Sequence, residues 1–336
     1  MLYYIDTGLK GNEMRIDMDH MERIRLSTNA KLQKTLGRFF VGPNYFFSKV
    51  DIQIENIERI PTDETVIFAL NHTDRYNYWP FQYKMWRMNP RLPYTTTWVK
   101  GDYYNNFVLG KFFDWTNNIP VPSRGYIIKE DFRDIINRKI SQFEYRLLRD
   151  LVNGKKQIQK LSEEITEALK TVLEYPRHLI DEIKIPYAEY IERYYRMLMA
   201  KVAEINFNAL FEKRLNVIIF PEGTRSDTLT SGKTGISHLA LKSRAKVVPV
   251  GCSGSDTIYP GNSPVAKKGK VVYRVGMPID PRDFIEDERK MDFVPFSRDA
   301  EDRLADELHD FALQVMEAIN ELLDERYRSL QPVTVV

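Results

Sequence analysis

Short apolar runs that stop at turn signals divide much of the chain. Residues 65–70 (TVIFAL) are β-branched and continuous, and they predict a buried strand that ends just before His72. A second strand is predicted at residues 215–220, where Pro221 ends it and Gly223 permits a tight turn. Both predicted strands therefore lead directly into segments that carry polar side chains.

Helical patterns alternate with these runs. After the first strand, Thr73 or Asp74 could cap a helix that begins near Arg75. Alternation of strands and helices predicts an α/β fold with a mixed, mostly parallel sheet flanked by helices. The remaining elements of this fold are expected as a helix at residues 234–244 and strands at residues 246–251 and 271–275.

The segment from residue 126 to residue 214 has a different pattern, because Leu and Ile recur there at helical spacing among Glu, Lys and Arg. It predicts a long helical insertion. The apolar face of a first helical stretch ends at the helix stop Asn153-Gly154, and a second apolar face follows it. A third helix is predicted after Pro186. The first two faces comprise Ile135, Ile136, Ile140, Phe143, Leu147 and Leu151, and then Ile158, Leu161, Ile165, Leu169 and Val172. One more amphipathic helix is predicted at residues 300–328.

Residues 31–47 combine cations with leucine and aromatic side chains, as segments at a membrane interface do. An alternative is a helix that packs its Leu and Phe face on the core and leaves its cations in solvent. A second basic cluster, Lys267, Lys268 and Lys270, precedes a predicted strand. It is either a charged turn or a contact for anionic headgroups, for the phosphates of CoA or for an acidic carrier protein.

Composition narrows the class of protein. The 49 basic and 47 acidic residues nearly cancel, so net charge gives no argument for nucleic-acid binding. Cys252 is the one cysteine, which excludes an intramolecular disulfide framework and a cysteine zinc cluster. No apolar run reaches the roughly 18 residues of a spanning helix, and residues 1–6 show no secretory signal. We therefore expect a cytoplasmic protein whose membrane contact, if any, is peripheral.

His72 differs from the four other histidines because it directly follows a predicted strand, where open α/β sheets place ligands. A helix that started there would disfavour imidazolium and keep the ring able to accept a proton. His178 and His238 lack a partner at metal-ligand spacing, so no metal site is expected. His72 is the candidate general base.

Three motifs in fixed order carry a family resemblance. They are Asn71-His72 with a polar residue five positions after the histidine, the string FPEGTRS at residues 220–226, and VVPV at residues 247–250. This order resembles the 1-acylglycerol-3-phosphate and glycerol-3-phosphate acyltransferase superfamily. The resemblance covers residues 61–124 and 215–279. It implies a division into an N-terminal segment (1–60) that could face a membrane, an acyltransferase domain (61–125 and 215–336), and the insertion (126–214).

The resemblance implies a reaction and roles. His72 would act as general base toward a hydroxyl of a glycerol-phosphate or lysophospholipid acceptor, which attacks the thioester of acyl-CoA or acyl carrier protein. The acceptor would be bound by residues of the FPEGTRS string, with Arg124 as a second phosphate candidate. These string residues are Glu222, Gly223, Thr224 and Arg225. An arginine fork and a glycine that exposes backbone amides both suit phosphate oxygens. No metal or redox cofactor is implied.

One departure concerns the partner of the histidine. The family places an aspartate five positions after the histidine, whereas this chain has Asn77, which can fix a tautomer but offers no charge. Asp74 is a substitute only if the turn is irregular. Another acid could complete the dyad, or the enzyme could be slow, or the chain could be a non-catalytic relative that binds lipid or a partner. An acyl-thioester hydrolase is a further alternative.

Overall fold

The computed structural model describes residues 14–155, 165–177, 185–285, 290 and 292–336. These residues form two compact units, each built from separate stretches of the chain. The boundaries of these units differ from those of the three parts predicted from the sequence (1–60, 61–125 with 215–336, and 126–214). That three-part division stays a prediction. Unit 1 comprises Met1–Arg23, Val99–Phe112 and Pro120–Val202, and unit 2 comprises Ile24–Trp98, Phe113–Ile119 and Ala203–Val336.

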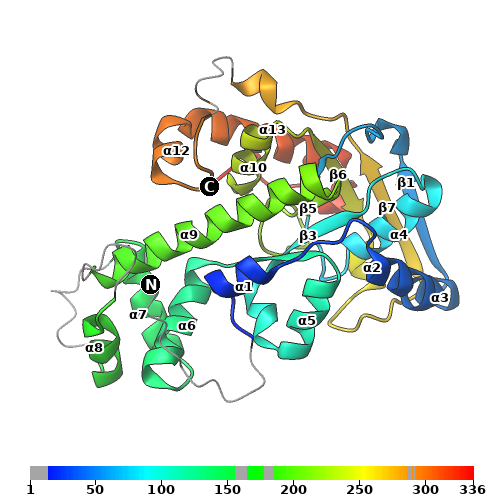
Figure 1. The fold of residues 1–336 in the computed structure, drawn as a ribbon. Helices are drawn as coiled ribbons and strands as arrows, with labels where there is room; N and C mark the ends of the chain where they lie inside the picture. The colour runs from blue at the N-terminus through cyan, green and yellow to red at the C-terminus, as the bar shows by residue number, and fades with distance from the viewer. Residues whose placement is uncertain (1–13, 156–164, 178–184, 286–289, 291) are drawn as a thin grey trace. The chain divides into compact units, whose positions relative to one another are not determined.

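A seven-stranded sheet has the strand order β1-β7-β6-β2-β5-β3-β4 (Figure 1). Pairs β1/β7, β6/β2, β2/β5 and β5/β3 are parallel, whereas β6/β7 is antiparallel. The predicted mixed, mostly parallel sheet flanked by helices is therefore confirmed. The strands are β1 (Val50–Glu55), β2 (Ile67–Leu70), β3 (Thr95–Lys100), β4 (Asn118–Val121), β5 (Asn216–Ile219), β6 (Val247–Ser253) and β7 (Gly269–Val275).

Both faces of the central strands are buried, which explains the continuous apolar runs in the sequence. Phe68 of β2 meets the ring of Phe81 in α4 (Tyr78–Met88), at 5.2 Å between centroids. On the opposite face, Gly251 of β6 lies so close to Leu322 of α13 (Ala305–Leu322) that a Cβ atom would stand 2.6 Å away. One helix thus covers each face of the sheet beside β2 and β6.

The helices of unit 1 include α1 (Met18–Arg23), α6 (Arg124–Ile136), α7 (Gln142–Val152) and α8 (Glu167–Glu174). In unit 2 the further helices are α2 (Lys31–Leu36), α3 (Gly42–Phe47), α10 (Gly235–Ser243), α11 (Ser255–Ile258) and α12 (Arg298–Arg303). Helices α5 (Phe107–Trp115) and α9 (Tyr187–Phe207) each contribute residues to both units.

Several helix boundaries differ from the sequence expectations. The apolar face predicted at residues 135–151 is two helices, because Asn137 adopts a left-handed conformation at the end of α6 and Ser141 caps α7. The C-terminal helix predicted at residues 300–328 is interrupted between α12 and α13 and ends at Leu322. The helix stop at Asn153-Gly154 is confirmed, since Gly154 has φ +69°.

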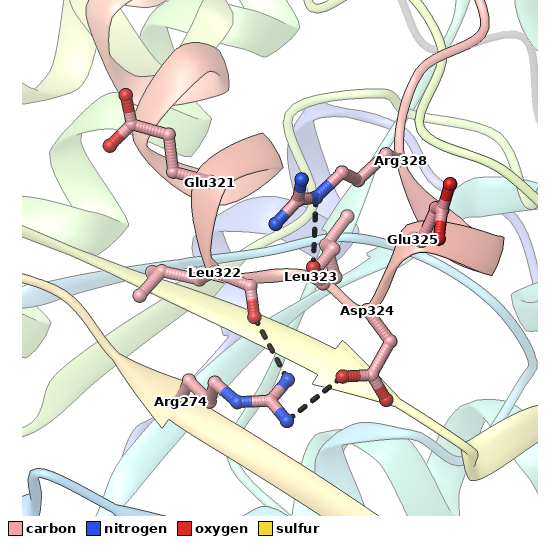
Figure 2. Close-up of a pocket in the computed structure, with 7 residues that line it drawn as sticks. All are labelled: Arg274, Glu321, Leu322, Leu323, Asp324, Glu325 and Arg328. Carbon is pink, nitrogen blue, oxygen red and sulfur yellow. Dashed lines mark hydrogen bonds and ion pairs between the residues drawn. The ribbon is translucent and has the colours of Figure 1, made fainter.

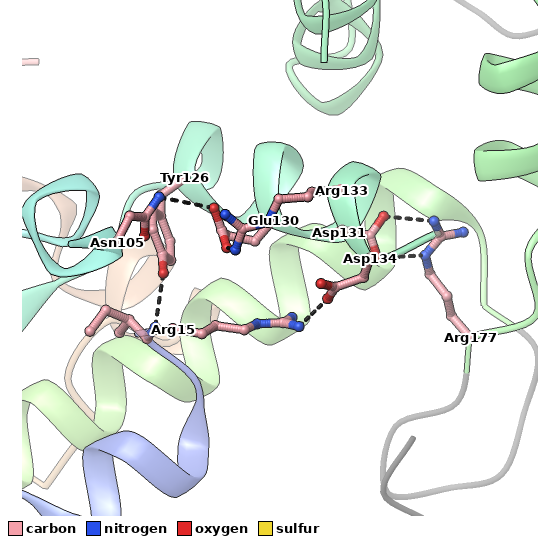
Figure 3. Close-up of polar contacts among 9 residues, drawn as sticks. Arg15, Asn105, Tyr126, Glu130, Asp131, Arg133, Asp134 and Arg177 are labelled. Carbon is pink, nitrogen blue, oxygen red and sulfur yellow. Dashed lines mark hydrogen bonds and ion pairs between the residues drawn. The ribbon is translucent and has the colours of Figure 1, made fainter. Parts of the chain in front are cut away.

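Buried charges hold the parts of unit 1 together (Figure 3). Arg177 donates to both carboxylate oxygens of Asp131, at 3.3 and 2.7 Å. Arg15 pairs with Asp134, and the Tyr126 hydroxyl accepts a hydrogen bond from the Ile16 backbone N–H at 2.8 Å. These contacts join the segment before α1 and the segment after α8 to α6. Removing Arg177 or Asp131 would leave a buried charge uncompensated.

None of the helices in the described part of the chain has the length and apolar character that a membrane span requires. Predictions that concern residues 1–6, Ile158, Leu161 and His178 lie outside the described residues. The third helix predicted after Pro186 is α9.

Candidate active site

The sheet topology brings His72 and the FPEGTRS string to the same sheet edge. Strands β2 and β5 are adjacent and parallel, so their carboxyl ends lie side by side. His72 follows β2 by two residues, and Glu222 follows β5 by three. All these residues belong to unit 2.

Backbone and carboxylate hydrogen bonds fix the two loops together. The Oε1 atom of Glu222 accepts from the His72 N–H at 2.7 Å, and the Ser226 N–H donates to the His72 carbonyl at 3.0 Å. The Oε2 atom of Glu222 accepts from both the N–H and the hydroxyl of Thr230, each at 2.9 Å. Glu222 is buried and both its oxygens are occupied, which makes it a group that positions the loops.

We expect Glu222→Gln to weaken this junction, because an amide NH₂ would face donors that now meet a carboxylate oxygen. Leaving buried donors without an acceptor costs about 1 to 3 kcal/mol of unfolding free energy. Urea denaturation would measure the loss, with Glu317→Gln on the exposed side of α13 as the control that should change little. An unchanged unfolding free energy in Glu222→Gln would contradict the positioning role.

A tight turn presents the rest of the string to solvent. Gly223 has φ +68°, and its N–H donates to the Phe220 carbonyl at 3.0 Å. A Cβ atom on Gly223 would lie 3.0 Å from the Nζ atom of Lys233, so this position suits glycine both in conformation and in space. Thr224 and Arg225 are exposed beyond the turn.

The His72 ring stacks on Phe220, with 4.2 Å between ring centroids and 22° between planes. The pKa of His72 is lowered to about 4, first by burial and then by the positive charge of Arg225, while a hydrogen bond with the Asn77 side chain acts in the opposite direction. The imidazole is therefore neutral near pH 7 and able to accept a proton. Ser226, the residue after Arg225, donates to the His72 carbonyl, so the loop that carries Arg225 contacts the loop that carries the ring.

The Asn77 side chain is fully buried beside the histidine. Its Nδ2 atom donates to the Asn71 carbonyl at 2.7 Å, and this bond leaves Oδ1 as the free end of the amide. The Oδ1 atom of Asn77 and the Nδ1 atom of His72 are both buried without a hydrogen bond of ordinary geometry. The Asn77 side chain nevertheless raises the pKa of the His72 ring, so these two side chains are the pair that occupies the family's dyad position.

Asn71 holds this loop to the neighbouring strand. Its amide donates to the Cys252 carbonyl at 3.0 Å and its Oδ1 atom accepts from the Cys252 N–H at 2.7 Å. The side chain thus replaces a pair of strand hydrogen bonds just beyond the end of β2. Cys252 is buried, and burial raises the pKa of its thiol far above the ordinary range, so this cysteine is a structural neighbour of the site.

Asp74 is held by other partners. Its Oδ1 atom accepts from the Tyr76 N–H at 2.8 Å, and Oδ2 accepts from the Thr73 hydroxyl at 3.0 Å. Burial raises the pKa of this carboxyl group. Among the described residues, no carboxylate contacts the His72 ring.

The helix expected to begin near Arg75 begins at Tyr78, so the prediction that Thr73 or Asp74 caps it is wrong. Asn77 occupies the cap position, yet its side chain bonds to Asn71 instead of the first helical turn. Because His72 precedes the helix by several residues, the helix dipole is too remote to keep it neutral. Burial and Arg225 have that effect instead.

Arg124 lies in unit 1, at the start of α6. Its guanidinium donates twice to the Glu192 carboxylate, at 2.5 and 3.0 Å, and stands 4.3 Å from the Tyr195 ring centroid. A phosphate would have to compete with Glu192 for this fork. Its role as a second phosphate ligand stays a prediction.

Sequence reasoning gave no role to several residues that build the site. Thr230 and Ser226 supply hydrogen bonds, Phe220 stacks on the histidine, and Lys233 lies against Gly223. Phe220 and Ser226 belong to the string itself, so the motif carried a signal for both. Thr230 lies beyond it and could not be identified without the geometry.

Two other features carry no such chemistry. The described residues contain no group of His, Cys, Asp and Glu side chains suited to a metal ion. A pocket of about 420 Å³ at the end of α13 (Figure 2) is lined by Arg274, Glu321, Leu322, Leu323, Asp324, Glu325 and Arg328. Arg274 bonds to Asp324 and to the Leu322 carbonyl there, and Arg328 bonds to the Leu323 carbonyl. These arginines are already paired with protein oxygens.

A family model described as Acyltransferase matches residues 185–253, which include the FPEGTRS string and β6. A matching curated protein is a 1-acyl-sn-glycerol-3-phosphate acyltransferase of Cocos nucifera, 36% identical over 81 residues. Over these parts of its length the chain is similar to acyltransferases. The match covers 24% of this chain and about a quarter (26%) of the length of that relative. His72 itself lies outside the residues that the family model matches.

A solved structure that resembles the chain is the 1-acyl-sn-glycerophosphate acyltransferase PlsC from Thermotoga maritima. The sequence identity is 16%, the TM-score is 0.39, and the overlap covers 79% of this chain and 75% of that one. A likeness of this size carries no argument about fold or function. The similarity to acyltransferases therefore rests on the two sequence matches.

Proposed function

We propose that this acyltransferase homologue transfers a fatty acyl group from an acyl thioester to a hydroxyl of a glycerol-phosphate or lysophospholipid acceptor. The observation that carries the proposal is the convergence of a neutral His72 and an exposed Arg225 through the Glu222 and Ser226 hydrogen bonds. One group accepts a proton, and the other suits a phosphate on the same molecule.

In this mechanism the Nε2 atom of His72 takes the proton of the acceptor hydroxyl while its oxygen attacks the thioester carbonyl carbon. The carbonyl electrons form an oxyanion, for which Lys233, whose side chain lies against Gly223, is the candidate donor. Collapse of this intermediate breaks the carbon–sulfur bond. The imidazolium then returns its proton to the sulfur, so the products are an ester and a free thiol. No acyl-enzyme is formed.

Asn77 takes the place of an orienting acid. Because its Nδ2 atom is held by Asn71, its Oδ1 atom is the acceptor available to the His72 Nδ1–H. That arrangement selects the tautomer with a lone pair on Nε2 and offers no charge to the imidazolium. The resulting base keeps a low pKa, which limits its strength but leaves it unprotonated in mildly acidic conditions.

The acid limb of kcat/KM should accordingly lie near pH 4 instead of near 6.5, because kcat/KM reports the pKa of the free enzyme. In Asn77→Asp a carboxylate would stabilise imidazolium, so the pKa of His72 rises and the acid limb moves to higher pH. Asn137→Asp, an exposed position in unit 1, is the charge-matched control. Initial rates from pH 3.5 upward would test this, and an unmoved limb in Asn77→Asp would contradict the proposed pairing.

Transfer itself is tested with labelled acyl-CoA, or labelled acyl carrier protein, and either glycerol 3-phosphate or lysophosphatidate. We expect label in the esterified acceptor, with one free thiol released for each ester formed. Free fatty acid released at the same rate without an acceptor would identify a thioester hydrolase. Absence of turnover with every donor and acceptor, together with retained lipid binding, would identify a non-catalytic relative.

The same proposal includes a location. A lysophospholipid acceptor resides in a membrane, so the chain would work in the cytoplasm in peripheral contact with the cytoplasmic membrane face. The exposed aromatic side chains of residues 31–47 support such a contact, because Phe39, Phe46 and Phe47 are 70, 77 and 79% exposed. The alternative in which these phenylalanines pack on the core is wrong, since Val41 and Tyr45 form the buried face.

A further inference from the structure

The sheet topology brings two basic segments, far apart in sequence, to the edge where His72 lies. Strand β7 is antiparallel to β6, so β7 starts where β6 and β2 end. Strand β1 is parallel to β7 and therefore starts at the same edge. Helix α3 leads into β1, and residues 260–268 lead into β7. Three strand spacings, about 14 Å, separate β1 from β2.

Direct contacts join these segments to one another. The Asn44 amide of α3 donates to the Pro264 carbonyl at 2.9 Å, and its Oδ1 atom accepts from the Ala266 N–H at 3.0 Å. The hydroxyl of Tyr45 in α3 accepts a hydrogen bond at 3.0 Å from that of Tyr259, which is buried just before the loop. The helical segment and the loop therefore form one continuous surface.

The same surface reaches the loop that carries the histidine. Tyr76, between His72 and α4, donates its hydroxyl to the Asn262 carbonyl at 2.7 Å. Phe40 meets the Trp79 ring of α4 with centroids 6.4 Å apart. Contacts on both sides thus connect the surface to the segment that includes Asn77.

The surface is both apolar and basic. Phe39, Phe40, Phe46 and Phe47 are all exposed, with 70, 40, 77 and 79% of their surface accessible. Val265 in the loop is 58% exposed. The cations Lys31, Lys34, Arg38, Lys49, Lys267 and Lys268 are exposed as well, and residues 31–49 and 260–270 contain no Asp or Glu. We call Phe39, Phe46, Phe47, Val265, Lys267 and Lys268 the basic aromatic surface.

We propose that the basic aromatic surface binds anionic phospholipid bilayers, with the loop of residues 260–268 as its second anchor beside α2 and α3. Exposed phenylalanines enter the acyl region and cations meet the headgroup phosphates, which is the arrangement of peripheral membrane segments. An acidic protein would be attracted by the same cations but gives no reason for several exposed aromatic rings. The inference that this surface also delivers the acceptor to His72 rests on the proposed function.

Vesicle co-sedimentation of the full chain tests the proposal. Vesicles of phosphatidylcholine with an equal part of phosphatidylglycerol should bind the chain, phosphatidylcholine alone should bind it much more weakly, and added salt should reduce binding. Lys267→Gln with Lys268→Gln should weaken binding roughly 30-fold. Phe46→Ser with Phe47→Ser should weaken it at least about a hundredfold. Because these side chains are exposed, thermal unfolding should change little.

Lys213→Gln is the matched control, because Lys213 precedes β5 and so lies at the opposite sheet edge. Its binding should equal that of the unaltered chain. Equal binding by all the variants, or the absence of binding to anionic vesicles, would overturn the proposal. So would binding to an acidic carrier protein without binding to vesicles.

Turnover separates this proposal from the proposed function. Lys267→Gln with Lys268→Gln should retain acyl transfer to soluble glycerol 3-phosphate and lose transfer to lysophosphatidate embedded in anionic vesicles. Transfer to the soluble acceptor without vesicle binding would overturn the surface and leave the reaction standing. Vesicle binding without any acyl transfer would support the membrane-binding surface and overturn the proposed reaction.

Discussion

His72→Ala is expected to lower the turnover of acyl transfer at least about a hundredfold, the low end for loss of a general base. The ring stands at the carboxyl end of β2, is neutral, and has its Nδ1 atom buried beside Asn77. Alanine would leave the acceptor hydroxyl without a group to take its proton. Single-turnover rates with saturating acyl-CoA and glycerol 3-phosphate would measure the loss of chemistry separately from binding.

His309→Ala is the control for this substitution, because His309 is an exposed histidine of α13. It should transfer acyl groups at the rate of the unaltered chain. Vesicle binding of His72→Ala should remain unchanged, and a cooperative thermal transition should show that the variant is folded. Full turnover in a folded His72→Ala would contradict the assignment of the base.

Arg225→Gln is expected to lower kcat/KM for phosphorylated acceptors roughly 10- to 150-fold, since a hydrogen bond to a charged group contributes about 1.5 to 3 kcal/mol. An acceptor without a phosphate makes no charged hydrogen bond with the Arg225 guanidinium, so the substitution removes nothing from its binding. Transfer to monoacylglycerol, which lacks the phosphate, should therefore change little. Comparison of the two acceptors isolates the phosphate contact from a general defect.

A second consequence of the same substitution concerns pH. Arg225 disfavours imidazolium, so its removal raises the pKa of His72 and moves the acid limb of kcat/KM upward. Arg298→Gln, in the exposed first turn of α12, is the control and should show neither effect. Equal losses with phosphorylated and uncharged acceptors would argue against a phosphate contact at Arg225.

The strands of this fold could be predicted because burial on both faces leaves a continuous apolar run. Residues 65–70 and 215–220 ended at His72 and Pro221, and β2 and β5 end within two residues of those positions. Adjacency of the two strands follows from the sheet order, which no run of residues specifies by itself. The motif order of the family supplied that step.

The surroundings of His72 could not be worked out from spacing. The cap expected at Thr73 or Asp74 is absent because Asp74 bonds to Tyr76 and Thr73 in an irregular turn. Glu222 could be singled out by its motif, yet its hydrogen bond to His72 joins two loops that are 150 residues apart in the chain. Such contacts depend on tertiary structure. From its residue type alone, Glu222 could equally have been a residue that binds the acceptor.

For residues 31–47, the sequence alone could not show which side of the helical segment is buried. Their pattern is amphipathic, but a helix with phenylalanines on one side and Val41 and Tyr45 on another can bury either side. The hydrogen bonds of Asn44 to the loop and of Tyr45 to Tyr259 fix which side is buried. The loop partner lies more than two hundred residues away in the chain.

Nitrogen-15 NMR of the His72 ring, assigned with His72→Ala, tests most directly whether a neutral imidazole shares an acceptor site with Arg225. At neutral pH we predict the Nδ1–H tautomer and a pKa near 4. Glycerol 3-phosphate should shift the ring signals to saturation in the unaltered chain, with a weaker affinity in Arg225→Gln. An imidazolium at neutral pH, or ring signals that ignore bound glycerol 3-phosphate, would contradict the proposed reaction.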